Sequence, residues 1–79
     1  MNYEVRDVTW VNAPKKKESD PTKVEIYANV TTGVVGDTKE FTRVDTFLAE
    51  CDISLSGTQM EAEVLAQATA YSQSLYPNT

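Results

Sequence analysis

The sequence has no histidine, one cysteine and three glycines among its 79 residues, and these scarcities exclude several classes of function. Histidine is the usual general base of active sites because its pKa lies near neutrality. A chain this short has little interior in which burial could retune a carboxylate or a lysine instead. The three glycines form no phosphate-binding loop. The composition therefore argues against an enzyme and favours a protein that acts through its surface.

The shortage of cysteine and histidine also removes the usual means of stabilising a small core. Cys51 has no second cysteine with which to pair, and a structural zinc needs about four Cys or His ligands. A core of this size rarely supplies more than about 3–5 kcal/mol. We therefore expect a single domain over residues 1–79 that gains stability by self-association or by docking on a protein partner.

Basic residues are absent from the second half of the chain. All seven Lys and Arg lie within residues 1–43, so the net charge of −5 belongs to residues 44–79. An acidic half repels a phosphate backbone, which argues against a nucleic-acid partner. No apolar run approaches the roughly 18 residues of a membrane span, and the N-terminus lacks the apolar stretch of a signal peptide. We expect a cytoplasmic or virion protein that contacts no membrane and is not secreted by a signal peptide.

Residues 2–12 and 23–32 have the composition and alternation of strands. In the first segment the apolar side chains change face at Arg6-Asp7, which predicts a β-bulge there or a strand covered on both sides. Half of residues 13–22 are charged and prolines bracket the charged run, so we interpret this segment as a solvated loop. Gly36-Asp37 offers a two-residue hairpin turn, which would pair Thr32 with Phe41 in a third strand.

Residues 45–52 leave two alternatives open. They could form a short helix with Asp45 as its N-cap, or they could continue the third strand. The last element is a helix, because Thr58 and Glu61 fit a capping box and good helix formers follow to about Leu75. Met60, Val64, Ala68, Tyr71 and Leu75 share one narrow arc of that helix and should pack on the sheet.

The opposite arc of the helix carries little charge. Three alanines recur every four residues and glutamines lie beside them, so the arc could receive another helix closely; the residues are Ala62, Ala66, Ala70, Gln67 and Gln73. The alternative is that alanine is simply the best helix former and glutamine an inert surface residue. We predict a partner-binding surface here that Ala66→Arg would abolish without unfolding the protein.

The remaining candidates for chemistry have simpler explanations. Cys51 has no base to activate it, so we expect a buried thiol. Residues 54–58 could bind an anion at the start of the helix, but capping explains them as well. Asp45, Glu50 and Asp52 match no compact calcium loop, and we expect no metal and no cofactor. Trp10 should pack in the core, and Tyr27 should be half exposed on the polar face of its strand.

One basic cluster lies within the charged loop. Lys15, Lys16 and Lys17 could contact phosphate or an acidic patch of a partner, or they could serve only to keep the loop soluble. Nearby Glu18 and Asp20 reduce the local positive charge. We carry the three lysines forward as a secondary partner-binding site.

The start of the chain shows a pattern of alternating apolar residues, Tyr3-x-Val5-x-x-Val8-x-Trp10-Val11-Asn12, followed by a polar loop and an alternating strand. This pattern resembles short phage- or prophage-encoded α+β proteins over about the first 30–45 residues. The resemblance implies a viral setting, in which small proteins are virion parts or inhibitors of host factors. It transfers no site residue to this chain.

These observations predict an α+β fold: a small antiparallel sheet of about three strands packed against one long C-terminal helix, with or without a second short helix. The function we expect is that of a non-catalytic protein–protein interaction module, a structural or assembly protein of a phage particle. The alternative is a soluble inhibitor that binds a host enzyme or nucleic-acid-processing complex through its acidic half. Binding by such an inhibitor should weaken steeply with salt.

Overall fold

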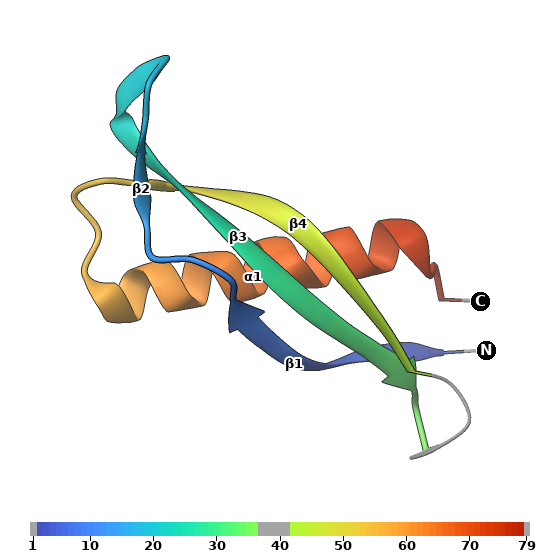
Figure 1. Ribbon diagram of the computed structural model, residues 1–79. Helices are drawn as coiled ribbons and strands as arrows, with labels where there is room; N and C mark the ends of the chain where they lie inside the picture. Colours follow the sequence, from blue (N-terminus) through green and yellow to red (C-terminus); the bar gives the residue numbers. More distant parts are fainter. Residues whose placement is uncertain (1, 37–41, 79) are drawn as a thin grey trace.

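A computed structural model describes residues 2–36 and 42–78 (Figure 1). Four strands precede one helix along the chain: β1 (Tyr3–Trp10), β2 (Lys15–Lys17), β3 (Asp20–Val34), β4 (Thr42–Asp52) and α1 (Gly57–Leu75). The strands form one antiparallel sheet, and α1 crosses a single face of it. The predicted α+β class is confirmed.

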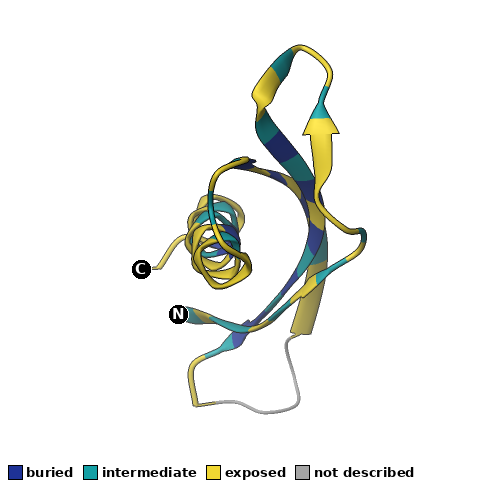
Figure 2. Ribbon diagram, turned by 90° about the vertical axis from the view of Figure 1, so that its left-hand side faces the viewer, coloured by how far each residue is buried: buried dark blue, intermediate teal, exposed yellow. Residues whose placement is uncertain are grey.

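The sheet is organised around β3, which pairs with all three other strands. β1 and β2 lie end to end along one side of β3, and β4 lies along the other side. The sheet curves around α1, while the β2–β3 hairpin extends away from the helix (Figure 2). One sheet face is therefore covered by the helix, and we call the other the uncovered face.

The expectation of a solvated loop over residues 13–22 was wrong in part. Lys15–Lys17 forms β2, and β3 already begins at Asp20. The long β3 extends past the end of β1, so its backbone groups are available to these residues despite their charge. Asn12 lies between β1 and β2 and is bound to β3, since its Oδ1 accepts from the N–H of Tyr27 at 2.7 Å.

The predicted bulge in β1 is confirmed. The register with β3 shifts between Val5 and Asp7, and this shift returns the apolar side chains to the helix-covered face. Val5, Val8 and Trp10 accordingly pack against the core, as predicted for Trp10. Arg6 at the bulge donates to the carbonyl of Val34 at 2.8 Å.

Close packing around the bulge explains a glycine in β3. The Arg6 side chain passes over Gly33, where a Cβ would lie 2.3 Å from the guanidinium carbon. Any larger residue at Gly33 would therefore displace the arginine.

The β3–β4 hairpin differs from the predicted one in its register. Thr32 pairs with Arg43 and not with Phe41, a shift of two residues. Asp37, the second residue of the predicted turn, and Phe41 lie outside the described residues. Gly36, the first residue of that turn, has a positive φ of +82°, which suits a turn. Of the two alternatives left open for residues 45–52, the structure has the strand and not the short helix: these residues belong to β4 and alternate between the two faces of the sheet.

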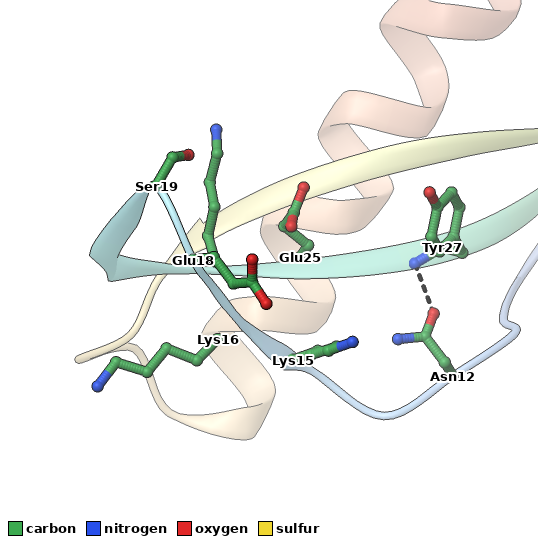
Figure 3. Close-up of a pocket in the computed structure, with 8 residues that line it drawn as sticks. Asn12, Lys15, Lys16, Glu18, Ser19, Glu25 and Tyr27 are labelled. Atoms are coloured by element: carbon green, nitrogen blue, oxygen red, sulfur yellow. Dashed lines mark hydrogen bonds between the residues drawn. The ribbon is translucent and has the colours of Figure 1, made fainter.

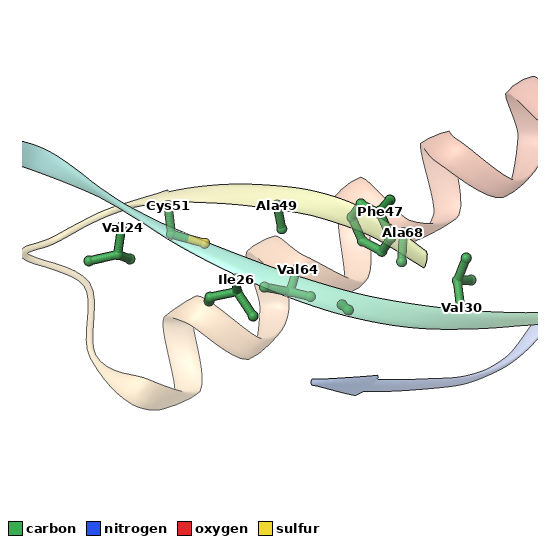
Figure 4. Packing of buried hydrophobic residues seen from close by; sticks show 9 residues of the cluster. Val24, Ile26, Val30, Phe47, Ala49, Cys51, Val64 and Ala68 are labelled. Carbon is green, nitrogen blue, oxygen red and sulfur yellow. The ribbon is translucent and has the colours of Figure 1, made fainter. Parts of the chain in front are cut away.

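The core lies between α1 and the covered faces of β3 and β4 (Figure 4). Nine apolar residues are buried there: Val24, Ile26, Ala28, Val30, Phe47, Ala49, Cys51, Val64 and Ala68. Three of them are alanines, and these small side chains let the helix approach the sheet closely. Cys51 is buried as predicted.

Polar and aromatic contacts complete the packing of α1 on the sheet. The hydroxyls of Thr32 and Ser72 are buried and hydrogen-bonded at 2.7 Å. Phe47 and Tyr71 stack with ring centroids 5.3 Å apart. The helix therefore presents the predicted stripe to the sheet, with Leu75 as an exception that is 43% exposed.

The capping box lies earlier than predicted. Ser56, and not Thr58, is the N-cap: its Oγ accepts from the N–H of Gln59 at 3.2 Å, and the Gln59 side chain accepts from the Ser56 N–H at 2.9 Å. Ser56 and Gln59 have the same spacing as the predicted pair, so the sequence allowed both positions. The helix ends at Leu75, as predicted.

Candidate functional site

The outer face of α1 is the predicted contact surface, and most of its predicted residues are exposed there. Ala62, Ala66, Ala70 and Gln73 all face away from the sheet. From Val64 to Leu75 the helix contains no charged residue. A solvated helix surface usually carries Lys and Glu, so this stretch is short of charge for a surface in contact with water alone.

Two exposed leucines lie beside this surface and not on it. Leu65, 51% exposed, lies on the side of α1 that faces β1, and Leu75, 43% exposed, belongs to the stripe that faces the sheet. The outer face of α1 therefore combines small and amide side chains over more than two turns. Such a surface can approach another protein closely without having to desolvate an ionised group.

Gln67 has a different role from the one predicted for it. Its side chain reaches from α1 to the outer edge of β4, where Oε1 accepts from the Glu50 N–H at 3.1 Å and Nε2 donates to the Glu50 carbonyl at 2.7 Å. The amide thereby imitates the pairing of a neighbouring strand. We call this pair of bonds the Gln67 clamp, and it removes Gln67 from the predicted contact surface.

The three lysines of β2 do not converge. Lys15 and Lys16 point in opposite directions from the strand (Figure 3). Lys17 forms an ion pair with Glu50 of β4. The hydrogen bond to that carboxylate raises the pKa of Lys17. The structure therefore divides the predicted cluster between two faces of the hairpin.

A cavity of about 440 Å³ lies beside β2. It is lined by the three lysines together with Asn12, Glu18, Ser19, Glu25 and Tyr27. Two carboxylates among these cations make the lining mixed in charge, which does not favour an anion. The cavity gives the secondary site a shape but no specific ligand.

Folding neutralises part of the acidic half. Glu50 lies against Lys17, and Asp52 lies 4.0 Å from Lys23. Asp52 Oδ1 also accepts from the backbone and the hydroxyl of Ser54, at 2.9 and 2.7 Å, and these bonds lower the pKa of Asp52. For these two carboxylates the charge separation along the sequence is thus not a separation in space.

The other candidates for chemistry are occupied by structural contacts. Burial raises the pKa of the Cys51 thiol, and nearby Glu63 raises it further, so the reactive thiolate is disfavoured. Ser56 is used as the helix cap. No group of three or more metal-ligating side chains occurs within residues 2–36 and 42–78.

Sequence reasoning missed the uncovered face of the sheet and the edge of β4. Tyr27 is 52% exposed, as predicted, and its pairing partner in β4, Leu48, is 40% exposed. Val44, four residues before Leu48 in β4 and on the same face of the sheet, is 60% exposed. The position of these side chains depends on β4 being a strand, which the sequence left open.

A second groove lies between β1 and α1. It has a volume of about 360 Å³ and is lined by Val5, Arg6, Asp7, Val8, Trp10, Glu61 and Leu65. Charged side chains interrupt its apolar lining, so it is less uniform than the outer face of α1.

Comparisons with protein-family models, with curated proteins and with solved structures find no significant match. Within the described part of the chain, no helix has the length and apolar character needed to cross a membrane.

Proposed function

We propose that this protein is a non-catalytic interaction module, an assembly subunit whose α1 outer face contacts a neighbouring protein subunit. The observation that supports the proposal is the uncharged surface of α1 from Val64 onward, with Ala66, Ala70 and Gln73 exposed on it. Interface cores are depleted in charged residues, and this surface has that composition. The phage setting rests on the resemblance of about the first 30–45 residues and stays a prediction.

The alternative of an acidic inhibitor has less support. It required a carboxylate surface on residues 44–79, but Glu50 and Asp52 each lie beside a lysine from the first half of the chain. The proposed subunit contact involves alanine and glutamine side chains. Its strength should therefore change little between low and moderate salt, because screening acts on charges.

The test is an arginine at the centre of the surface. Ala66→Arg should abolish higher-order association, measured by light scattering at high protein concentration, and leave the circular dichroism spectrum unchanged. Thr58→Arg adds the same charge at an exposed position in the first turn of the helix and should have no effect on association. Equal association by the wild type and Ala66→Arg would refute the proposal.

A further inference from the structure

The sheet has exposed edges on both sides, and they are not protected equally. β1 is broken by a bulge with Arg6 and Asp7 at its site, and β2 is three lysines long. Bulges, charges and short length are the features that prevent an edge from pairing with another strand. β4 has a regular register from Thr42 to Asp52 and contains no proline. Its edge is the least protected in the described structure.

The Gln67 clamp shows which backbone groups of β4 point outward. It binds the N–H and C=O of Glu50, so those groups point away from β3. Because the direction alternates along an antiparallel strand, the backbone groups of Val44, Thr46 and Leu48 point outward too. Within residues 2–36 and 42–78 no strand pairs with this edge. We call residues 44–48 the open edge.

We propose that the open edge pairs with the open edge of a second copy of this chain, antiparallel, around a two-fold axis at Thr46. Val44 of one copy then lies opposite Leu48 of the other, and Thr46 lies opposite Thr46. Each of these opposed residues exchanges both of its backbone hydrogen bonds with its counterpart. The result is a continuous sheet across the two copies with the same surface used on both sides.

The side chains of the open edge are complementary to themselves in this register. Val44 and Leu48, which are 60% and 40% exposed in the single chain, cover each other on the uncovered face. Tyr27, 52% exposed, lies beside Leu48 and extends the apolar band. No charged side chain lies directly opposite one of the same sign. A foreign strand would have to match this order of apolar and polar residues, whereas a second copy matches it by symmetry.

Neighbouring registers are opposed by particular residues. An axis at Asp45 would place two carboxylates directly opposite each other, which destabilises a strand pair. An axis at Phe47 would bring Val44 to the backbone of Glu50, which the Gln67 clamp already occupies. An axis at Val44 would leave Leu48 beyond the described strand of the second copy. The axis at Thr46 avoids all three conflicts within residues 44–48, and the pairing ends there because Thr42 would meet the Glu50 backbone that the Gln67 clamp occupies.

The pairing also fits the arrangement of the helix. The clamp shows that the Gln67 side of α1 lies over the edge of β4. Ala70, one turn further along this side, is exposed and small. A small side chain on this side of α1 leaves room beside the edge of β4.

This inference concerns the edge of the sheet and does not rest on the proposed contact at the outer face of α1. Ala66→Arg tests the helix face, and substitutions at Thr46 test the open edge. Because the two surfaces carry separate variants, failure of one proposal is distinguishable from failure of the other.

The experiment is a charge exchange at the two-fold axis, measured by sedimentation equilibrium. The wild type should have twice the 8.8 kDa mass of one chain. Thr46→Lys alone and Thr46→Glu alone should each be monomeric, since like charges would face each other across the axis. An equal mixture of the two variants should recover the dimer. Circular dichroism of each variant checks that the fold is retained.

Thr9→Lys is the matched control. Thr9 and Thr46 flank Asn29 from opposite sides on the uncovered face, but Thr9 lies in β1, away from the open edge. Thr9→Lys should therefore remain dimeric. A monomeric wild type, a dimeric Thr46→Lys or a mixture that stays monomeric would each overturn the inference. So would a dimer that Ala66→Arg abolishes.

Discussion

Consecutive residues of β3 separate the two faces of the sheet. Ile26 is fully buried under α1, whereas Tyr27, the next residue, is 52% exposed on the uncovered face. The same contrast recurs in β4, where Phe47 is 8% exposed and Leu48 is 40% exposed. Large apolar side chains thus occur on both faces, but one layer of helix covers only one of them. The covered face supports the fold, and the uncovered face has apolar area available for contacts.

The largest expected effect tests that difference directly. Ile26→Ala should lower the free energy of unfolding by about 3 kcal/mol, since it removes buried methyl groups and leaves a cavity under α1. Tyr27→Thr, one residue away, should change it by about 0.5 kcal/mol because half of the ring is already in solvent. Urea unfolding of both variants provides the measurement. Equal losses would contradict the division between the faces.

A buried hydrogen bond on the covered face gives the next largest effect. Thr32→Val should cost about 1–2 kcal/mol, because the Ser72 hydroxyl keeps its place under the sheet without its partner. Ser72→Ala should cost a similar amount for the converse reason. The double variant should cost less than the sum, and a thermodynamic cycle from urea unfolding measures the difference. Strict additivity would show that the two hydroxyls do not stabilise each other.

The features that the sequence predicts well are those determined by short-range pattern. The alternation from Lys23 to Thr32 places Ile26 and Tyr27 on the correct faces, and the change of phase at Arg6-Asp7 identifies the bulge. The C-terminal helix is predicted with its end at Leu75. In each case the pattern of side chains follows the geometry of one element, so no knowledge of a neighbouring element is needed.

The features that the sequence does not predict depend on a distant partner. Lys15–Lys17 becomes a strand because β3 extends past β1, although its composition is that of a loop. Residues 45–52 are a strand because β3 is available to pair with them along their full length. The Gln67 clamp needs α1 to lie over the edge of β4. The open edge depends on β4 being a strand and on the Gln67 clamp, so it could not be predicted from the sequence.

The helix cap shows that an exposed residue can also stabilise the fold. Ser56→Ala should cost about 1 kcal/mol, since the first turn of α1 loses the acceptor for the Gln59 N–H. Thr58→Ala should cost less than about 0.5 kcal/mol, because Thr58 is exposed and lies inside the helix. Thermal unfolding followed by circular dichroism compares the two. A larger loss for Thr58→Ala than for Ser56→Ala would mean that Thr58 is the N-cap, as the sequence alone suggested.

The Gln67 clamp lies at the border between the two faces and allows a smaller comparison. Gln67→Ala should lower the free energy of unfolding by about 1 kcal/mol, since both backbone groups of Glu50 lose their partner. Gln73→Ala should change it by less than about 0.5 kcal/mol, because Gln73 is exposed on the outer face of α1 and alanine favours the helix. Equal effects in urea unfolding would argue against the clamp.

The smallest effect is a pH dependence from the covered face. Burial beneath α1 raises the pKa of Cys51 from its usual value of 9.0, and Glu63 adds to the shift. The unfolded chain therefore loses this proton at lower pH than the folded chain does. Cys51 contributes its full stability below that usual value, and the contribution is lost as pH rises through the raised pKa.

Cys51→Ala isolates this contribution, because other groups that titrate at alkaline pH are common to both proteins. The difference in unfolding free energy between the wild type and Cys51→Ala should become less favourable to the wild type from neutral pH to about pH 10. Leu48→Thr, a change on the uncovered face that removes no titratable group, should leave the alkaline slope as it is in the wild type. A difference between wild type and Cys51→Ala that stays constant with pH would mean that the thiol is as well solvated in the folded protein as in the unfolded chain.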